Sequence, residues 1–203
     1  MKNPSTHSGQ ADKVVFGFWV YIMSDCVLFA GLFATYAVLG GAAFGSPGAA
    51  ELFSLPFVFV ETLFLLTSSF TAGVALLVAT KATKVSAPGR SAESYKLLLL
   101  LLTTLLLGLA FLSMEVYEFH KLIVEGYGPS TNAFLSAFFT LVGTHGLHVL
   151  LGCVWLVVLM GHIVVRGLSA GTLRKLICFS LFWHFLDIIW IFIFTFVYIM
   201  GAL

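Results

Sequence analysis

Five long apolar segments, none of which shows the polar alternation of a β-strand, constrain the fold more than any other feature of this sequence. A helix of roughly 20 residues crosses a hydrocarbon core about 30 Å thick, because each residue advances the helix by about 1.5 Å. Strands of an outer-membrane barrel instead alternate polar with apolar residues over about 10 positions. We therefore predict an all-α membrane protein with five transmembrane helices in one domain, residues 16-203, after an N-terminal tail of residues 1-15. The predicted helices cover approximately residues 16-40, 56-80, 96-119, 133-165 and 177-200.

The composition agrees with lipid as the solvent of this chain. Hydrophobic residues make up 60% and charged residues 9%, whereas an ordinary soluble domain has roughly 25% charged residues. A formal net charge of +1 leaves no basic surface of the size that nucleic acid requires, so we expect no nucleic-acid partner. The three cysteines, Cys26, Cys153 and Cys178, show no CxxC spacing, which argues against a disulfide framework and against a zinc site.

The basic residues are concentrated in alternate connections, and this pattern predicts the orientation of the chain. Lys and Arg near helix ends are retained on the cytoplasmic side of a membrane. Of the 10 basic residues, all but Lys121 lie in the N-terminal tail or in the second and fourth connections. We therefore expect a multi-pass protein of the bacterial inner membrane with a cytoplasmic N-terminus and a periplasmic C-terminus. The residues on the predicted cytoplasmic side are Lys2, Lys13, Lys81, Lys84, Arg90, Lys96, Arg166, Arg174 and Lys175.

Four acidic residues stand out inside the apolar segments, namely Asp25, Glu61, Glu115 and Asp187. An ionisable group in hydrocarbon is costly, so each of them requires a partner or has a function. Asp25 has two interpretations, as a proton relay or as a neutral carboxylic acid bonded to a neighbouring helix. Glu61 and Glu115 fall together in the outer half of the membrane. They either share a proton, face the outer headgroup region or pack between helices, and packing is the more common role.

Three histidines, His145, His148 and His184, are predicted near the middle of the membrane together with Asp25 and Asp187. His145 and His148 are three positions apart, as are His184 and Asp187, so each pair shares one face of its helix. We expect both faces to point inward. Imidazole is a common ligand of metal ions and haem, but two histidines are an incomplete ligand set. We therefore expect no catalytic residue, metal or cofactor in this chain, and we expect these residues to bond helices or a lipid headgroup, with a proton site at His184 and Asp187 as the rarer alternative.

Four stretches of this sequence form a recognisable set: MSDCVLFA from Met23, MEVYEFHKLI from Met114, FLSAFFTLVGTHGLHVLLG from Phe134 and LFWHFLDIIWIFIF from Leu181. They resemble subunit III of the haem-copper terminal oxidases, and in particular its cytochrome bo quinol oxidase branch. The combination of GTHGLHV with WHFLDIIW is specific, and the resemblance extends over essentially the whole chain. Many cytochrome c oxidase members look like seven-helix versions with two further helices in front, which this chain lacks.

The resemblance implies a non-catalytic subunit of a proton-pumping ubiquinol oxidase, which couples quinol oxidation to the reduction of oxygen to water. It implies two leading helices in a V against a three-helix bundle, phospholipid in the cleft, and docking on the catalytic subunit I, which holds the haems and copper. Asp25 occupies a position where the wider family often has a glutamate near a proton path of subunit I. The position makes Asp25 a candidate for proton uptake. An aspartate there keeps the acid, but its side chain has a shorter reach than a glutamate, which departs from the family pattern.

Three alternative functions remain open at this stage. The chain resembles subunit III of a cytochrome c oxidase as well, because that branch belongs to the same family. A stand-alone proton or ion carrier would commonly show inverted repeats and broken helices, and neither is evident. A membrane metalloenzyme of the histidine-box kind would need more histidines, in tighter groups, than the six of this sequence.

Overall fold

The computed structural model describes the backbone of residues 5–39, 54–84 and 90–202, and the side chains of residues 13–39, 54–83 and 94–201. The described backbone is helical apart from short turns and contains no strand. Its last helix continues first as a π-helix, η1 (Phe194–Ile199), and then as a 3₁₀ turn, η2 (Met200–Ala202). The five long helices are α1 (Ser5–Leu39), α3 (Leu55–Lys84), α4 (Arg90–Val124), α5 (Ala133–Arg166) and α6 (Ala170–Ile193).

The five predicted transmembrane helices are confirmed. Each long helix contains a segment apolar enough and long enough to cross a membrane. The helices extend beyond the predicted segments, however, because α1 begins at Ser5 and α4 at Arg90. A helix continues past the hydrocarbon wherever its backbone can still form i to i−4 hydrogen bonds, so hydropathy predicts the membrane-spanning part better than the helix ends.

Side-chain caps fix the short connections around α5 and α6. The Asn132 side chain accepts a hydrogen bond from the Leu135 amide at 2.7 Å and so caps the start of α5. At the other end of α5, Gly167 adopts a φ of 68°, in the left-handed region that favours glycine, and its amide donates to the Ile163 carbonyl. The Ser169 hydroxyl then caps α6 by accepting from the Thr172 amide. This tight turn makes α5 and α6 antiparallel neighbours.

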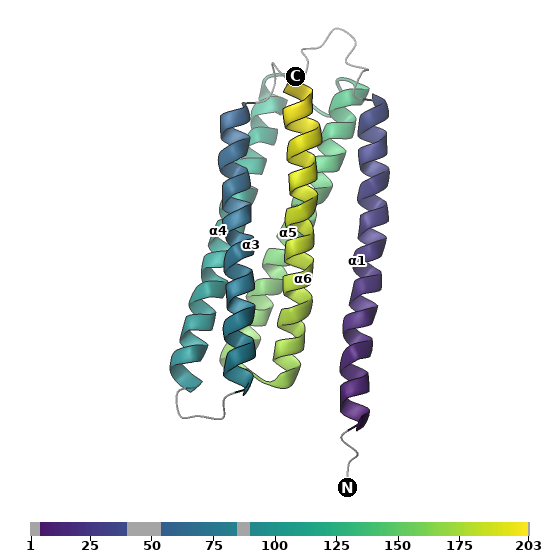
Figure 1. The fold of residues 1–203 in the computed structure, drawn as a ribbon. Helices are drawn as coiled ribbons and strands as arrows, with labels where there is room; N and C mark the ends of the chain where they lie inside the picture. Colours follow the sequence, from purple (N-terminus) through teal and green to yellow (C-terminus); the bar gives the residue numbers. More distant parts are fainter. Residues whose placement is uncertain (1–4, 40–53, 85–89, 203) are drawn as a thin grey trace.

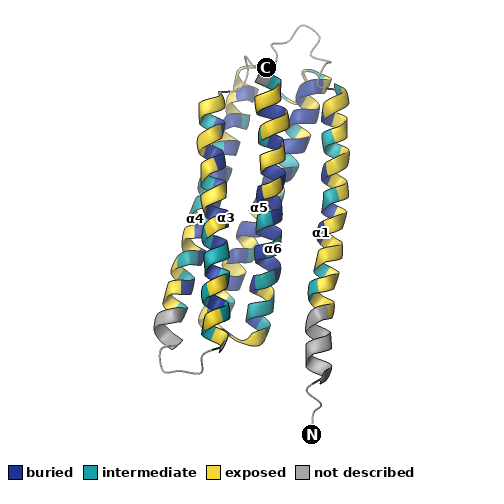
Figure 2. Cartoon of the chain, viewed as in Figure 1, coloured by how far each residue is buried: buried dark blue, intermediate teal, exposed yellow. Residues whose placement is uncertain are grey.

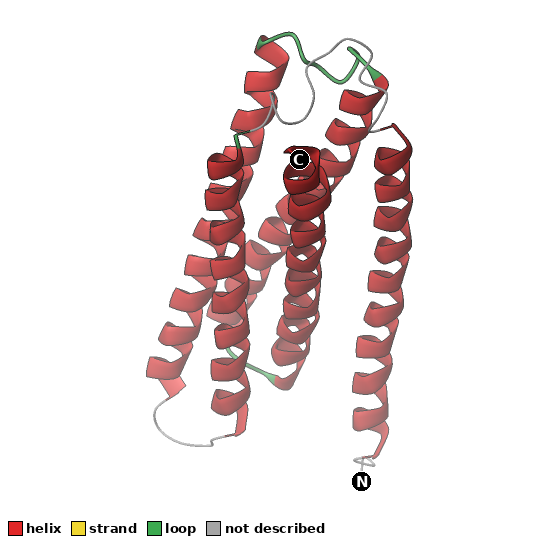
Figure 3. Cartoon of the chain, turned by 45° about the horizontal axis from the view of Figure 1, so that its top comes forward, coloured by secondary structure: helices red, strands yellow, loops and turns green. Residues whose placement is uncertain are grey.

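The helices run roughly along one axis, with the two described ends of the chain at opposite ends of the bundle (Figure 1). α3 packs against α4 and α6, whereas α1 packs against α5 and α6 at the edge of the bundle. A view turned by 45° shows the same arrangement (Figure 3). The V formed by the two leading helices stays a prediction.

Burial is concentrated on α6. In its membrane-spanning segment 67% of the most apolar stretch is buried, against 22% for α1. The outward faces of the helices are exposed (Figure 2), and they carry large apolar side chains, for example Val27, Phe70 and Val158. Lipid tails can solvate such outward-facing side chains, so the bundle is suited to a bilayer. The high burial of α6 makes it the central helix of this bundle.

The Trp183 indole of α6 packs against two glycines on neighbouring helices. A Cβ atom placed at Gly108 of α4 would lie 3.0 Å from the ring, and one at Gly152 of α5 would lie 2.7 Å from it. The indole nitrogen donates a hydrogen bond to the Ser68 hydroxyl of α3 at 3.0 Å. One side chain therefore joins α6 to three other helices, and small residues make the close approach possible.

We predict that Gly152→Ala destabilises the protein by about 1–3 kcal/mol, because the added methyl group overlaps the Trp183 ring. The measurement is the free energy of unfolding of the purified chain in detergent. Gly161→Ala, on the same helix, is the matched control, since a Cβ there would have no neighbour within 4 Å. Equal stability of the two variants would contradict this packing.

Candidate functional site

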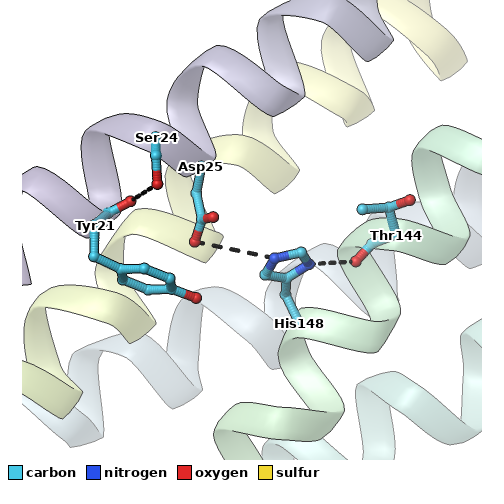
Figure 4. Close-up of polar contacts among 5 residues, drawn as sticks. All are labelled: Tyr21, Ser24, Asp25, Thr144 and His148. Carbon is cyan, nitrogen blue, oxygen red and sulfur yellow. Dashed lines mark hydrogen bonds and ion pairs between the residues drawn. The ribbon is translucent and has the colours of Figure 1, made fainter.

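A carboxyl group and an imidazole face each other where α1 packs on α5 (Figure 4). Asp25 Oδ2 lies 4.0 Å from His148 Nε2, and the two side chains are 10% and 14% exposed. On its other side the imidazole is fixed by the Thr144 carbonyl, 2.7 Å from Nδ1. A carbonyl oxygen only accepts, so Nδ1 carries a hydrogen and Nε2 of a neutral ring is left as an acceptor facing Asp25.

This geometry suits a pair that shares one proton. Either Asp25 carries the hydrogen and points it at Nε2, or the imidazole carries it and points it at a carboxylate. The 4.0 Å separation exceeds a hydrogen bond of about 2.7–3.2 Å, so a small movement of either side chain or a bridging water is needed to complete the bond. Asp25 and His148 therefore form a candidate site.

The surroundings of the pair are partly polar and partly aromatic. The Tyr21 side chain, one turn before Asp25, interacts electrostatically with the Asp25 carboxyl, and its ring lies beside Asp25 in Figure 4. The fully buried Phe29 packs against the His148 ring with centroids 5.4 Å apart. Tyr21 itself is exposed, so the site is closed toward the bundle and reachable from its edge.

His145 bonds to α6, whereas His148 faces α1, although the two residues lie on one side of α5. Its Nε2 lies 3.2 Å from the Leu186 carbonyl of α6, to which it donates. The ring is fully buried between Phe111 and Trp190, with centroids 5.7 and 5.1 Å away. The polar face predicted on α5 is therefore divided between α6 and α1.

His184 and Asp187 face α3 and not the histidines of α5. His184 Nδ1 donates to the Ser180 carbonyl at 2.6 Å, and its Nε2 would lie 3.4 Å from a Cβ at Gly73. Asp187 is buried and interacts with Ser69 of α3. Of the two polar faces predicted to point inward, that of α5 contacts α6 only through His145, which bonds to the α6 backbone.

Glu61 and Glu115 do lie close enough to interact electrostatically, and a third glutamate joins them. Glu118 is 6% exposed and accepts a hydrogen bond from the Tyr198 hydroxyl at 2.8 Å. Sequence reasoning missed Glu118, although its position three residues after Glu115 places it on the same face of α4. Within the part of the chain that the structure describes, no group of three or more His, Cys, Asp or Glu side chains is arranged to hold a metal ion.

Comparison with known families matches residues 4–202 to the family described as cytochrome c oxidase subunit III. The chain belongs to this family. The predicted family resemblance is thereby confirmed, and with it a multi-pass membrane protein of the haem-copper oxidase subunit III type.

Individual relatives cover nearly the whole chain. It is 56% identical to the cytochrome bo(3) ubiquinol oxidase subunit 3 of Pseudomonas aeruginosa over 191 residues, 94% of this chain and 87% of that protein. The protein of the same description from Pseudomonas putida is 50% identical, with 97% and 89% covered. The cytochrome c oxidase subunit 3 of Bacillus sp. (strain PS3) is 44% identical, with 91% and 84% covered. The family thus includes subunits of quinol and of cytochrome c oxidases.

Proposed function

We propose that this chain is the non-catalytic subunit III of a proton-pumping cytochrome bo type ubiquinol oxidase. The observation that carries the proposal is the high identity, over almost the full length, to relatives described as bo(3) ubiquinol oxidase subunit 3. In this proposal the haems and copper belong to subunit I, on which the chain docks in the bacterial inner membrane. His145 bonds α5 to α6 and His148 faces Asp25, which fits a role in assembly and proton uptake.

The relative from Bacillus favours a second candidate, subunit III of a cytochrome c oxidase. Purification of the affinity-tagged chain from its native membrane distinguishes the two. We expect a complex that contains haem and copper and that oxidises ubiquinol, while the separated chain retains neither haem nor metal. A complex that oxidises only reduced cytochrome c would support the second candidate, and a chain free of oxidase subunits would contradict both.

The proposed orientation rests on the concentration of basic residues in the N-terminal tail and the second and fourth connections. We expect a reporter fused after Leu203 to be active only in the periplasm. A reporter inserted near Gly89 is expected to be active only in the cytoplasm. The opposite pattern would reverse the assignment of both ends of the bundle.

A groove at the end of the bundle where α1 and α6 begin supports the proposed binding of phospholipid. Its volume is about 880 Å³, and its lining combines basic residues with apolar ones. A headgroup phosphate fits near the basic side chains, and an acyl chain fits along the aromatic wall. The lining residues are Lys13, Val14, Gly17, Phe18, Tyr21, Trp155, Gly171, Arg174, Lys175 and Cys178.

We predict that replacing Lys13, Arg174 and Lys175 by Gln weakens the binding of phosphatidylglycerol, by about 1 kcal/mol for each charge removed. Native mass spectrometry of the delipidated oxidase, titrated with this lipid, measures the loss. Arg166→Gln is the matched control. Arg166 ends α5, just before α6 begins, and therefore lies at the same end of the bundle, but it does not line the groove. Unchanged binding by the triple variant would remove the groove from the proposal.

Asp25 is the proposed proton-uptake residue, since it faces an imidazole that can share its proton and lies at the edge of the bundle. Asp25→Asn preserves most hydrogen bonding but cannot release a proton. We expect the variant oxidase to assemble and to turn over more slowly, most clearly at alkaline pH, where protons are scarce. The control is Asp187→Asn, because Asp187 faces α3. Wild-type turnover of the Asp25 variant from neutral to alkaline pH would leave Asp25 as a packing residue.

A further inference from the structure

Three glutamates gather between α3 and α4, away from the Asp25 pair. Glu61 comes from α3, and Glu115 and Glu118 come from α4; they are 0%, 3% and 6% exposed. Each interacts electrostatically with the other two. Both carboxyl oxygens of Glu61 and Oε2 of Glu115 are buried without a hydrogen-bond partner. We name these three residues the carboxyl cluster.

Two further segments close the carboxyl cluster. The Glu115 carboxyl lies directly against the backbone of α5, where a Cβ at Gly146 would be only 2.7 Å from the carboxyl carbon. From the other side, the Tyr198 hydroxyl of η1 donates to Glu118 Oε2 at 2.8 Å. η1 is a π-helix, a form that often occurs at functional sites. Four segments of the chain therefore enclose these acids.

The charges around the carboxyl cluster do not neutralise it. Lys121 attracts Glu118, but its ammonium is half-exposed and lies 3.9 Å from a fourth acid, Glu125. From α5 the nearest titratable group in sequence is His145, next to Gly146, and its Nε2 is already bonded to α6. Three neighbouring carboxylates without a matching cation repel one another in a medium of low dielectric constant. Protons on the carboxyl groups relieve this repulsion, and a protonated oxygen can also donate to its neighbour.

Glu118 connects the carboxyl cluster to a cavity near one end of the bundle. The cavity has a volume of about 210 Å³ and is lined by Ser54, Phe57, Tyr117, Glu118, Lys121 and Leu122. This volume has room for several water molecules, each of which takes about 30 Å³ in the liquid. Glu61 lies six residues after Leu55, the first residue of α3, and therefore about 9 Å from that end of the helix. The path from the helix end to the innermost acid is short.

We propose that the carboxyl cluster is a proton-binding site, loaded from water in this cavity through Glu118. A hydronium ion transfers its proton to the Glu118 carboxylate and leaves as water, and the proton then moves to Glu115 or Glu61. Tyr198 orients Glu118 for this exchange and keeps its own proton. Among the described residues, the three carboxyl groups are not arranged as a group that could hold a metal ion. It lies where α3 begins and α4 ends, the end of the bundle that carries the C-terminus (Figure 1).

A hydrophobic carbodiimide tests the proposal on the wild-type oxidase complex. Dicyclohexylcarbodiimide adds to a protonated carboxyl group in an apolar site and, with all atoms retained, leaves a stable N-acylurea. Peptide mass spectrometry should find this adduct on Glu61 or Glu115, with a yield that falls as the pH rises, and little on the exposed Glu125. If none of the three glutamates forms an adduct at any pH, the proposal is wrong.

Infrared difference spectra of the complex during a pH titration provide the second measurement. We expect the carbonyl stretch of protonated carboxyl groups to change with pH, and Glu61→Gln or Glu118→Gln to remove part of that change. Glu125→Gln, an acid beside Lys121 but outside the carboxyl cluster, should leave it intact. Tyr198→Phe should slow the change after a pH jump without abolishing it. If the Glu61 and Glu118 variants fold and match the wild-type spectrum, these acids exchange no protons and only fill space.

Discussion

Buried hydrogen bonds from α6 to its neighbours determine how the other helices can be placed. The Trp183 indole donates to Ser68 of α3, and two turns later the Trp190 indole donates to Thr62 of the same helix. Because the two helices are antiparallel, these bonds fix both their register and their facing sides. In hydrocarbon an unbonded indole N–H would stay unsatisfied, since no water is present to replace the lost partner. A sliding movement of α3 along α6 would break both bonds together.

The apolar interior of the bilayer explains which parts of the structure could be predicted from the sequence. Helix number and type follow from hydropathy, because the bilayer imposes a length on any apolar helix. Positions of ionisable residues within the apolar segments also follow directly, and so Asp25, His145 and Asp187 were recognisable as unusual. Helix ends were less predictable, since the N-terminal part of α1 is polar and yet helical.

Pairing between helices could not be predicted in the same way. His145 and His148 share a face by spacing, but a face of an α-helix is wide enough to border two neighbours, here α6 and α1. Which neighbour each imidazole meets depends on the rotation of α5, and Gly146 and Gly152 set that rotation by admitting Glu115 and Trp183. A single sequence shows that these glycines exist but not which side chain fills the space. Glu118 lies only one residue before the end of the predicted segment 96-119, and the sequence does not show that this position is buried.

Buried polar residues in this chain fall into two groups that differ in their effect on stability. The tryptophans, Ser68 and Thr62 are bonded to one another, so their burial costs little and their loss would separate helices. Glu61 is the opposite case: it is fully buried, and neither of its oxygens has a partner. Such a residue lowers stability, and an apolar side chain of similar size would pack at less cost. Departures from local stability rules are expected at sites with a function. Packing therefore accounts for the polar residues that hold α3 to α6, but it does not account for Glu61.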